Sequence, residues 1–272
     1  KWDGSTWSAL AKGMNSSVRA LAVRGTEVFA GGIFTTAGGA TASHITKWDG
    51  SVWSALGTGM DGAIYALAVS GSDLYAGGNF TSAGGVANTK HIAKWDGSIW
   101  SALGTGIDYD VYALAVSGGN LYAGGWFTSA GGVADTKYIA KWDGSTWSAL
   151  GTGMNNVVYT LAVSGSDLYA GGSFTRAGIE AANRIAKWNG SAWAQLSAGM
   201  DDTVRAMVTR GGDLYAGGRF TTAGGAEANR IAKWNGGAWA PLGKGMNSGV
   251  YALAVSGNDL FAGGDFDTAG DV

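Results

Sequence analysis

The strongest constraint on this chain is a motif that returns at an almost constant interval. The segment Lys-Trp-Asp-Gly-Ser-x-Trp occupies residues 1–7 and returns five more times, slightly varied, at intervals of 46 or 47 residues. The later copies begin at Lys47, Lys94, Lys141, Lys187 and Lys233. A period of this length is typical of folds built from one repeated supersecondary unit.

The second repeat contains the pattern of four short strands. Residues 64–70 are β-branched, aromatic and small apolar residues, and residues 74–80 resume the pattern after a Gly-Ser-Asp turn. Residues 91–95 and 99–103 flank Asp96-Gly97, a strong hairpin signal. Each repeat therefore predicts one antiparallel sheet of four strands, which is the blade of a β-propeller.

The two ends of the chain carry complementary halves of this unit. Residues 1–10 correspond to the last two strands of a repeat, and residues 250–272 correspond to the first two. We therefore predict an all-β fold: a six-bladed β-propeller of four-stranded antiparallel blades, closed by a two-plus-two clasp of the termini. Residues 1–272 form a single domain in this prediction, with blade 6 formed by 250–272 together with 1–10, so that no sheet edge stays open.

Two repeated features are expected to be structural. Twelve of the 13 tryptophans fall at two positions of the repeat, and burying each one removes about 150–250 Å² of surface from water. The pair Gly77-Gly78 lies inside a predicted strand, where glycine costs about 0.5–1 kcal/mol relative to alanine. We expect these glycines to permit the close approach of a neighbouring sheet.

The composition argues against several classes of function. The formal net charge is −2 and only 14% of the residues are charged, which argues against a nucleic-acid partner. No apolar run reaches about 18 residues, so we expect no membrane insertion. The chain has no cysteine, which excludes disulfides, a thiolate nucleophile and a cysteine metal site. We expect a monomer without cofactor or metal.

The repeat resembles a known family. Its Leu-Tyr-Ala-Gly-Gly, Trp-Asp-Gly and x-Trp-Ser-x-Leu segments resemble the kelch repeat of galactose-oxidase-type propellers along the whole chain. They are also similar to the Trp/Gly-rich propeller repeats of secreted bacterial proteins and of the fungal cortical polarity-marker family, which implies an extracellular or cell-surface location. The oxidase chemistry of that family requires copper and a Tyr–Cys cross-link, and this chain has no cysteine and only His44 and His91.

Differences between repeats point to a binding face. The loop after each fourth strand and the loop between the second and third strands vary, and both emerge on the same side of a blade. The third blade adds aromatic residues flanked by carboxylates, which suit stacking on a sugar or an aliphatic side chain. These candidate ligand-binding residues are Asp108, Tyr109, Asp110, Trp126 and Tyr138. The alternative is sequence drift at tolerant positions.

Other polar residues are weaker candidates. Arg19 and Arg205 could meet an anion at the mouth of the central channel, or merely stack on neighbouring side chains. Asp108/Asp110 and Asp201/Asp202 could act as acid and base or hold Ca²⁺, or they could be solvated loop residues. His44 and His91 should lie one blade apart and share no metal. No residue stands out as catalytic.

These observations favour a non-enzymatic binding or adhesion module of a secreted or cell-surface protein. Its ligand would be a glycan or a protein segment held by the variable loop face. The first alternative is a purely structural repeat domain of a larger protein. The second is a glycan-active propeller enzyme, which would need a loop carboxylate or histidine with a strongly perturbed pKa in a deep pocket.

Overall fold

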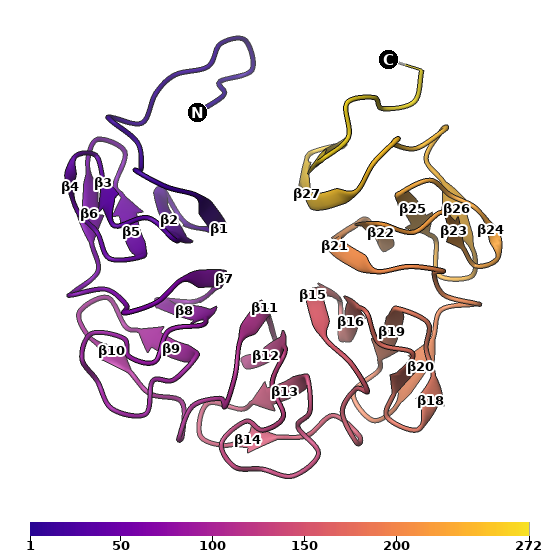
Figure 1. The fold of residues 1–272 in the computed structure, drawn as a ribbon, viewed down its shortest axis with the longest axis horizontal. Helices are drawn as coiled ribbons and strands as arrows, with labels where there is room; N and C mark the ends of the chain where they lie inside the picture. Colours follow the sequence, from indigo (N-terminus) through magenta and orange to yellow (C-terminus); the bar gives the residue numbers. More distant parts are fainter. Residues whose placement is uncertain (272) are drawn as a thin grey trace.

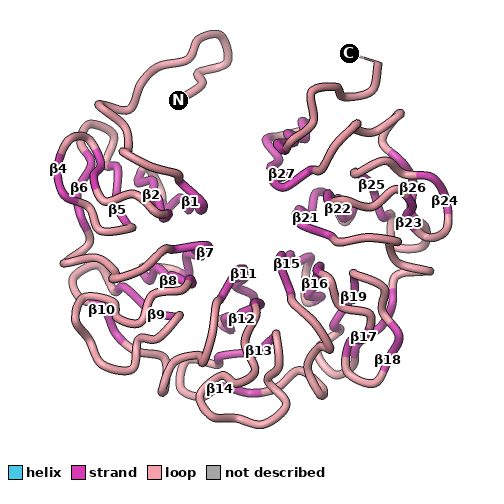
Figure 2. Tube along the Cα trace, in the orientation of Figure 1, coloured by secondary structure: helices cyan, strands magenta, loops and turns pink. Residues whose placement is uncertain are grey.

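The computed structural model, which describes residues 1–271, arranges the repeats as a curved row of small sheets around a central hollow (Figure 1). Strands, turns and loops account for these residues (Figure 2). Within the same range, no helix is long and apolar enough to cross a membrane. The all-β prediction is confirmed.

Each complete repeat forms one antiparallel four-stranded sheet, as predicted. The innermost strands are β1 (Val18–Arg24), β7 (Ile64–Ser70), β11 (Val111–Ser117), β15 (Val158–Ser164), β21 (Val204–Arg210) and β27 (Val250–Ser256). The second strands are β2 (Glu27–Gly32), β8 (Asp73–Gly78), β12 (Asn120–Gly125), β16 (Asp167–Gly172), β22 (Asp213–Gly218) and β28 (Asp259–Gly264). The third strands are β5 (Ile45–Trp48), β9 (Ile92–Trp95), β13 (Ile139–Trp142), β19 (Ile185–Trp188) and β25 (Ile231–Trp234). The outer strands are β6 (Trp53–Ala55), β10 (Trp100–Ser101), β14 (Trp147–Ser148), β20 (Trp193–Gln195) and β26 (Trp239–Pro241).

The loop between the second and third strands starts earlier and ends later than the sequence predicted. In the second repeat β8 ends at Gly78, and β9 begins only after His91, whose φ of 62° is left-handed. A left-handed residue turns the chain out of the extended conformation, so the strand cannot include it. Three of these loops also contain a short hairpin that the sequence did not reveal. These are β3 (Thr36–Ala37) with β4 (Ala40–Thr41), β17 (Arg176–Ala177) with β18 (Glu180–Ala181), and β23 (Thr222–Ala223) with β24 (Ala226–Glu227).

In the five complete blades, the first glycine of the Gly-Gly pair allows one blade to approach the next. A Cβ on Gly77 would lie 2.6 Å from Cγ1 of Val111, the first residue of the next inner strand. Val111 is fully buried in this position. Gly78 has a different role, because its Cβ would collide with the carbonyl oxygen of Ala63 in the loop that leads into its own blade. The expectation of a neighbouring sheet therefore holds for Gly77 and not for Gly78.

The repeated tryptophans pair within a blade and bond to the blade before it. In the second complete blade the rings of Trp95 and Trp100 lie 5.2 Å apart, and Trp100 Nε1 donates to the carbonyl oxygen of Leu56 at 3.0 Å. The same bond recurs at 2.9–3.1 Å from Trp53, Trp147, Trp193 and Trp239. Leu56 follows the outer strand of the preceding blade, so this bond connects the outer edges of two neighbouring blades. The glycine contact connects the same two blades near the central axis.

The sixth blade differs from the prediction. Strands β27 and β28 form a two-stranded sheet, and the hairpin of Trp2 and Trp7 pairs only with itself, so within residues 1–271 the predicted clasp of 1–10 with 250–272 does not form. The ring is open at this point (Figure 1). Trp7 is consequently 79% exposed, in contrast to the buried tryptophans of most other blades.

Two alanine substitutions at equivalent positions test the contact between blades. Gly77→Ala should lower the free energy of unfolding by about 1–3 kcal/mol, because the new Cβ overpacks against Val111. Gly263→Ala should be nearly neutral, because its Cβ would meet only the Ala252 Cβ, at 3.9 Å. Urea denaturation of both variants measures the difference. An equal loss of unfolding free energy in both variants would contradict the absence of a neighbouring blade next to β28.

Candidate functional site

The loop that joins two blades lies in the seam between them. Ile107 N donates to the carbonyl oxygen of Lys90 in the second complete blade at 3.0 Å, and Asp108 N donates to that of Ser129 in the third at 3.1 Å. The same two contacts recur at other seams. Each joining loop is therefore clamped between the long loops of two consecutive blades. Side chains from three different segments meet there.

Asp108, a predicted ligand-binding residue, is part of this clamp. Its carboxylate accepts hydrogen bonds from the Thr128 and Ser129 amides and from the Thr128 hydroxyl. Burial opposes its ionisation, but these hydrogen bonds outweigh that effect and hold the pKa of Asp108 below its ordinary value. Equivalent bonds are made by Asn15, Asp61, Asn155, Asp201 and Asn247. Asp108 is thus positioned as a structural residue.

The seam between the second and third complete blades carries an aromatic cluster. The rings of Tyr109 and Trp126 meet edge to face at 5.2 Å, and both side chains are 51% exposed. The ring of His91 is stacked on that of Tyr109, with the ring centres 6.1 Å apart. We call His91, Tyr109, Asp110 and Trp126 the aromatic seam. The structure therefore brings together three of the five predicted residues of this blade.

Asp110 links the aromatic seam to the central hollow. Its Oδ1 lies 3.8 Å from His91 Nδ1, and its Oδ2 accepts a 3.2 Å hydrogen bond from the hydroxyl of Tyr112. Burial raises the pKa of Tyr112 above its ordinary value, and the charge and hydrogen bonding of Asp110 raise it further. Tyr112 therefore stays protonated and donates to Asp110 over the whole neutral range.

Tyr138 does not join the aromatic seam. Its backbone lies beside Trp126, since Gly125 N donates to its carbonyl oxygen at 3.0 Å, but its side chain is half-buried against the core of the following blade. His91, one repeat earlier, is the residue that faces Tyr109. This shift by one repeat arises because the joining loop that carries Tyr109 crosses from one blade to the next.

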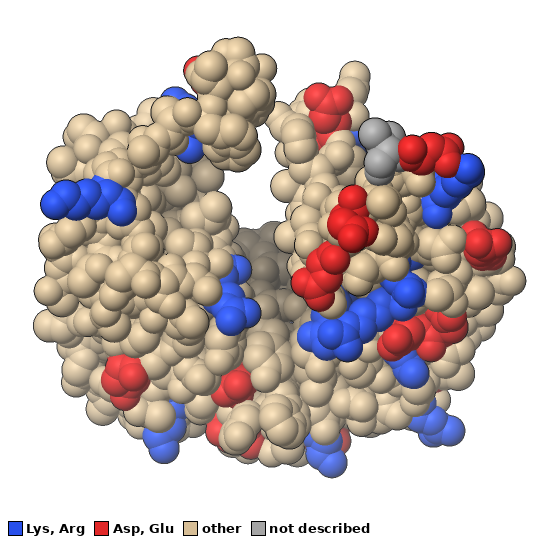
Figure 3. All heavy atoms as spheres, turned by 45° about the horizontal axis from the view of Figure 1, so that its top comes forward, with Lys and Arg blue, Asp and Glu red and all other residues tan. Residues whose placement is uncertain are grey.

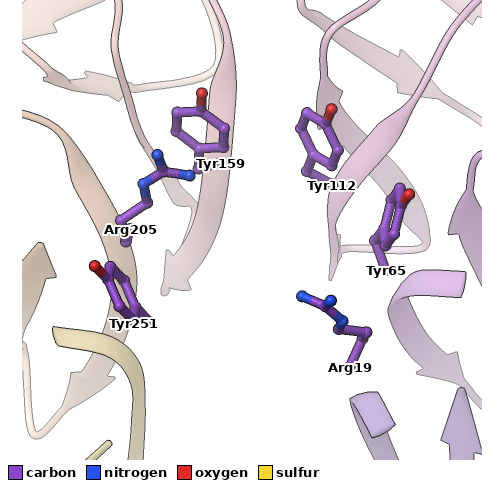
Figure 4. Close-up of a pocket in the computed structure, with 6 residues that line it drawn as sticks. All are labelled: Arg19, Tyr65, Tyr112, Tyr159, Arg205 and Tyr251. Atoms are coloured by element: carbon purple, nitrogen blue, oxygen red, sulfur yellow. The ribbon is translucent and has the colours of Figure 1, made fainter. Parts of the chain in front are cut away.

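Six residues of the inner strands line a cavity of about 620 Å³ in the central hollow, which we call the central depression. They are Arg19, Tyr65, Tyr112, Tyr159, Arg205 and Tyr251 (Figure 4). The rings of Tyr65 and Tyr112 lie 5.4 Å apart, and those of Tyr112 and Tyr159 lie 5.7 Å apart. The guanidinium carbon of Arg205 lies 3.9 Å from the Tyr159 ring centre. Stacked side chains therefore form much of its wall.

The other candidates have local partners. Asp201 makes the clamp bonds to Thr221 and Thr222, and Asp202 accepts from Thr203. The two carboxylates therefore serve different loops. Among residues 1–271, no group of three or more His, Asp or Glu side chains is placed to hold a metal ion. His44 and His91 belong to successive blades.

The fold and its loop face define a β-propeller domain, a class that is consistent with a binding or structural module. The chain belongs to the family described as the Rax2 C-terminal beta propeller domain, whose sequence model matches residues 5–162, more than half of the chain. No curated protein matches the sequence. The kelch-like type of the repeat stays a prediction.

Solved structures show the same fold at low identity. The chain is similar to the WD40 beta propeller domain of Doa1, with a TM-score of 0.62 and 16% identity over 93% of this chain and 77% of that one. It is also similar to the computationally designed Ika8 protein, with a TM-score of 0.60 and 20% identity over 93% of this chain and 70% of the other. These likenesses support the propeller architecture alone.

The clamp carboxylates predict part of the acid sensitivity. The pKa values of Asp61, Asp108 and Asp201 lie below the ordinary 3.8, so their stabilising effect is complete above that pH and is lost as the pH falls through the folded-state values. Replacing all three by asparagine, which other repeats use naturally, should leave the fold intact. Urea unfolding at pH 7 and pH 3 should show a smaller acid-induced loss than in the unaltered chain. An unchanged loss would contradict this role.

Proposed function

We propose that this domain is a non-enzymatic binding module whose variable loop face holds a glycan through the aromatic seam. The exposed pair of Tyr109 and Trp126 carries the proposal, because two half-exposed aromatic rings at 5.2 Å are not required by the blade itself. The repeats that lack these residues build the same blade and the same clamp. The two rings are therefore available for a ligand.

The chemistry of the aromatic seam suits a sugar. Aromatic faces and edges pack against the apolar C–H surface of a sugar ring, and adjacent polar groups orient its hydroxyls. Asp110 supplies acceptor oxygens at the base of the seam, and His91 Nδ1 is occupied by the carbonyl oxygen of Gly78 at 3.1 Å. This leaves Nε2 of His91 as a further polar atom of the same site. A peptide side chain that packs on the two rings is the competing ligand.

The resemblance to repeats of secreted proteins supports a location outside the cell or on its surface, which we include in the proposal. A domain with a purely structural role is the second candidate. It is favoured by the clamp bonds, which occupy the most regular polar positions of the loop face. The two candidates differ in whether the aromatic seam meets a ligand.

Binding measurements on two variants test the proposal. Trp126→Ala and Tyr109→Ala should each weaken a glycan found on an array by at least tenfold, about 1.4 kcal/mol, when measured by calorimetry. Trp7→Ala is the matched control, because Trp7 is an exposed tryptophan of the first hairpin and should leave the affinity unchanged. Unaltered binding in both seam variants, or binding of peptides but of no glycan, would contradict the proposal.

A further inference from the structure

The central depression adjoins the aromatic seam through the Tyr112–Asp110 hydrogen bond, but its lining has a different chemical character. Its six lining residues are two arginines and four tyrosines, with no carboxylate among them. Figure 4 shows Arg19 and Arg205 reaching from opposite sides toward the space between them. Two guanidinium groups that face one cavity repel each other unless an anion lies between them.

Arg205 has an unfilled hydrogen-bonding position. Its Nε is buried and has no acceptor among residues 1–271, although a buried donor without a partner costs about 1–3 kcal/mol. Its guanidinium stacks over Tyr159 at 3.9 Å, and because Nε is out of contact with solvent, the terminal Nη groups are the donors that a ligand in the cavity can reach. A planar pair of donors of this kind binds two oxygens of a carboxylate, sulfate or phosphate group.

The carboxylates near the central depression do not line it. Asp110 lies behind the wall, where it accepts from the Tyr112 hydroxyl and approaches His91. Asp202 and Asp265 lie on the far side of Tyr251, in a smaller hollow that they share with Arg219 and Arg230. Figure 3 shows basic side chains on both sides of the opening. On one of these sides, acidic side chains lie next to the basic ones. The positive charge of Arg19 and Arg205 therefore remains directed at the cavity.

We propose that the central depression binds a small organic oxyanion, with Arg205 and Arg19 holding the charged group and the tyrosine rings holding a sugar or other ring body. The cavity of about 620 Å³ is in the range that encloses a small molecule. The hydroxyls of Tyr65 and Tyr159 belong to the same lining and can donate to further oxygens, whereas the Tyr112 hydroxyl already donates to Asp110 (Figure 4). The site uses no residue of the aromatic seam.

Calorimetric titration at low ionic strength tests this site with four probes: sodium sulfate, sodium phosphate, glucuronate and neutral glucose. Glucuronate should bind more tightly than either inorganic anion, since only glucuronate also fills the ring-lined space, and glucose should not bind detectably. The affinity for glucuronate should fall as the salt concentration rises. Equal affinities for glucuronate and glucose, or stronger binding of sulfate or phosphate than of glucuronate, would overturn the proposal.

Substitutions assign the effect to the two arginines. Arg205→Gln and Arg19→Gln should each weaken glucuronate binding at least tenfold, and Arg205→Lys should give an intermediate loss because it keeps the charge but not the planar fork. Arg176→Gln, at an exposed arginine of β17, is the matched control. Arg19 is exposed, so Arg19→Gln should leave the fold intact. This variant therefore tests the site even if Arg205→Gln unfolds. Unchanged binding in the Arg19 variant would contradict the proposal, whereas Trp126→Ala should have no effect here.

Discussion

The packing of one blade against the next is the interaction on which the rest of the structure depends. A single four-stranded sheet cannot bury two tryptophans and an inner row of branched side chains by itself. From the second complete blade onward, each inner strand inserts its first branched residue, such as Val111, over a glycine of the blade before it. At the outer rim an indole N–H bonds to a carbonyl oxygen across the same seam. Two contacts per seam thus set the fold.

The functional surfaces follow from these seams. Because each joining loop passes between two blades, residues from neighbouring repeats meet there, as His91 meets Tyr109. The inner strands present one side chain per blade to the central hollow, so six residues at equivalent positions form one cavity wall. The repeat supplies a constant frame, and single substitutions within it, such as Trp126 or Arg205, give each surface its chemistry.

Much of this could be predicted from the sequence, because the period and the alternation of apolar residues report local structure directly. The strand order, the paired tryptophans and the packing role of Gly77 followed from them. The open ring did not, since the rotation between blades depends on side-chain packing that a period does not encode. Neither did the structural role of Asp108 nor the displacement of Tyr138, because both depend on which loops the fold places side by side.

Hydrogen exchange of the tryptophan indole N–H groups, followed by NMR, tests the importance of the seams most directly. The account predicts slow exchange for Trp100, Trp147, Trp193 and Trp239, which are buried and bonded across a seam, and rapid exchange for Trp7. Rapid exchange at the four buried positions, or protection of Trp7 equal to theirs, would contradict it.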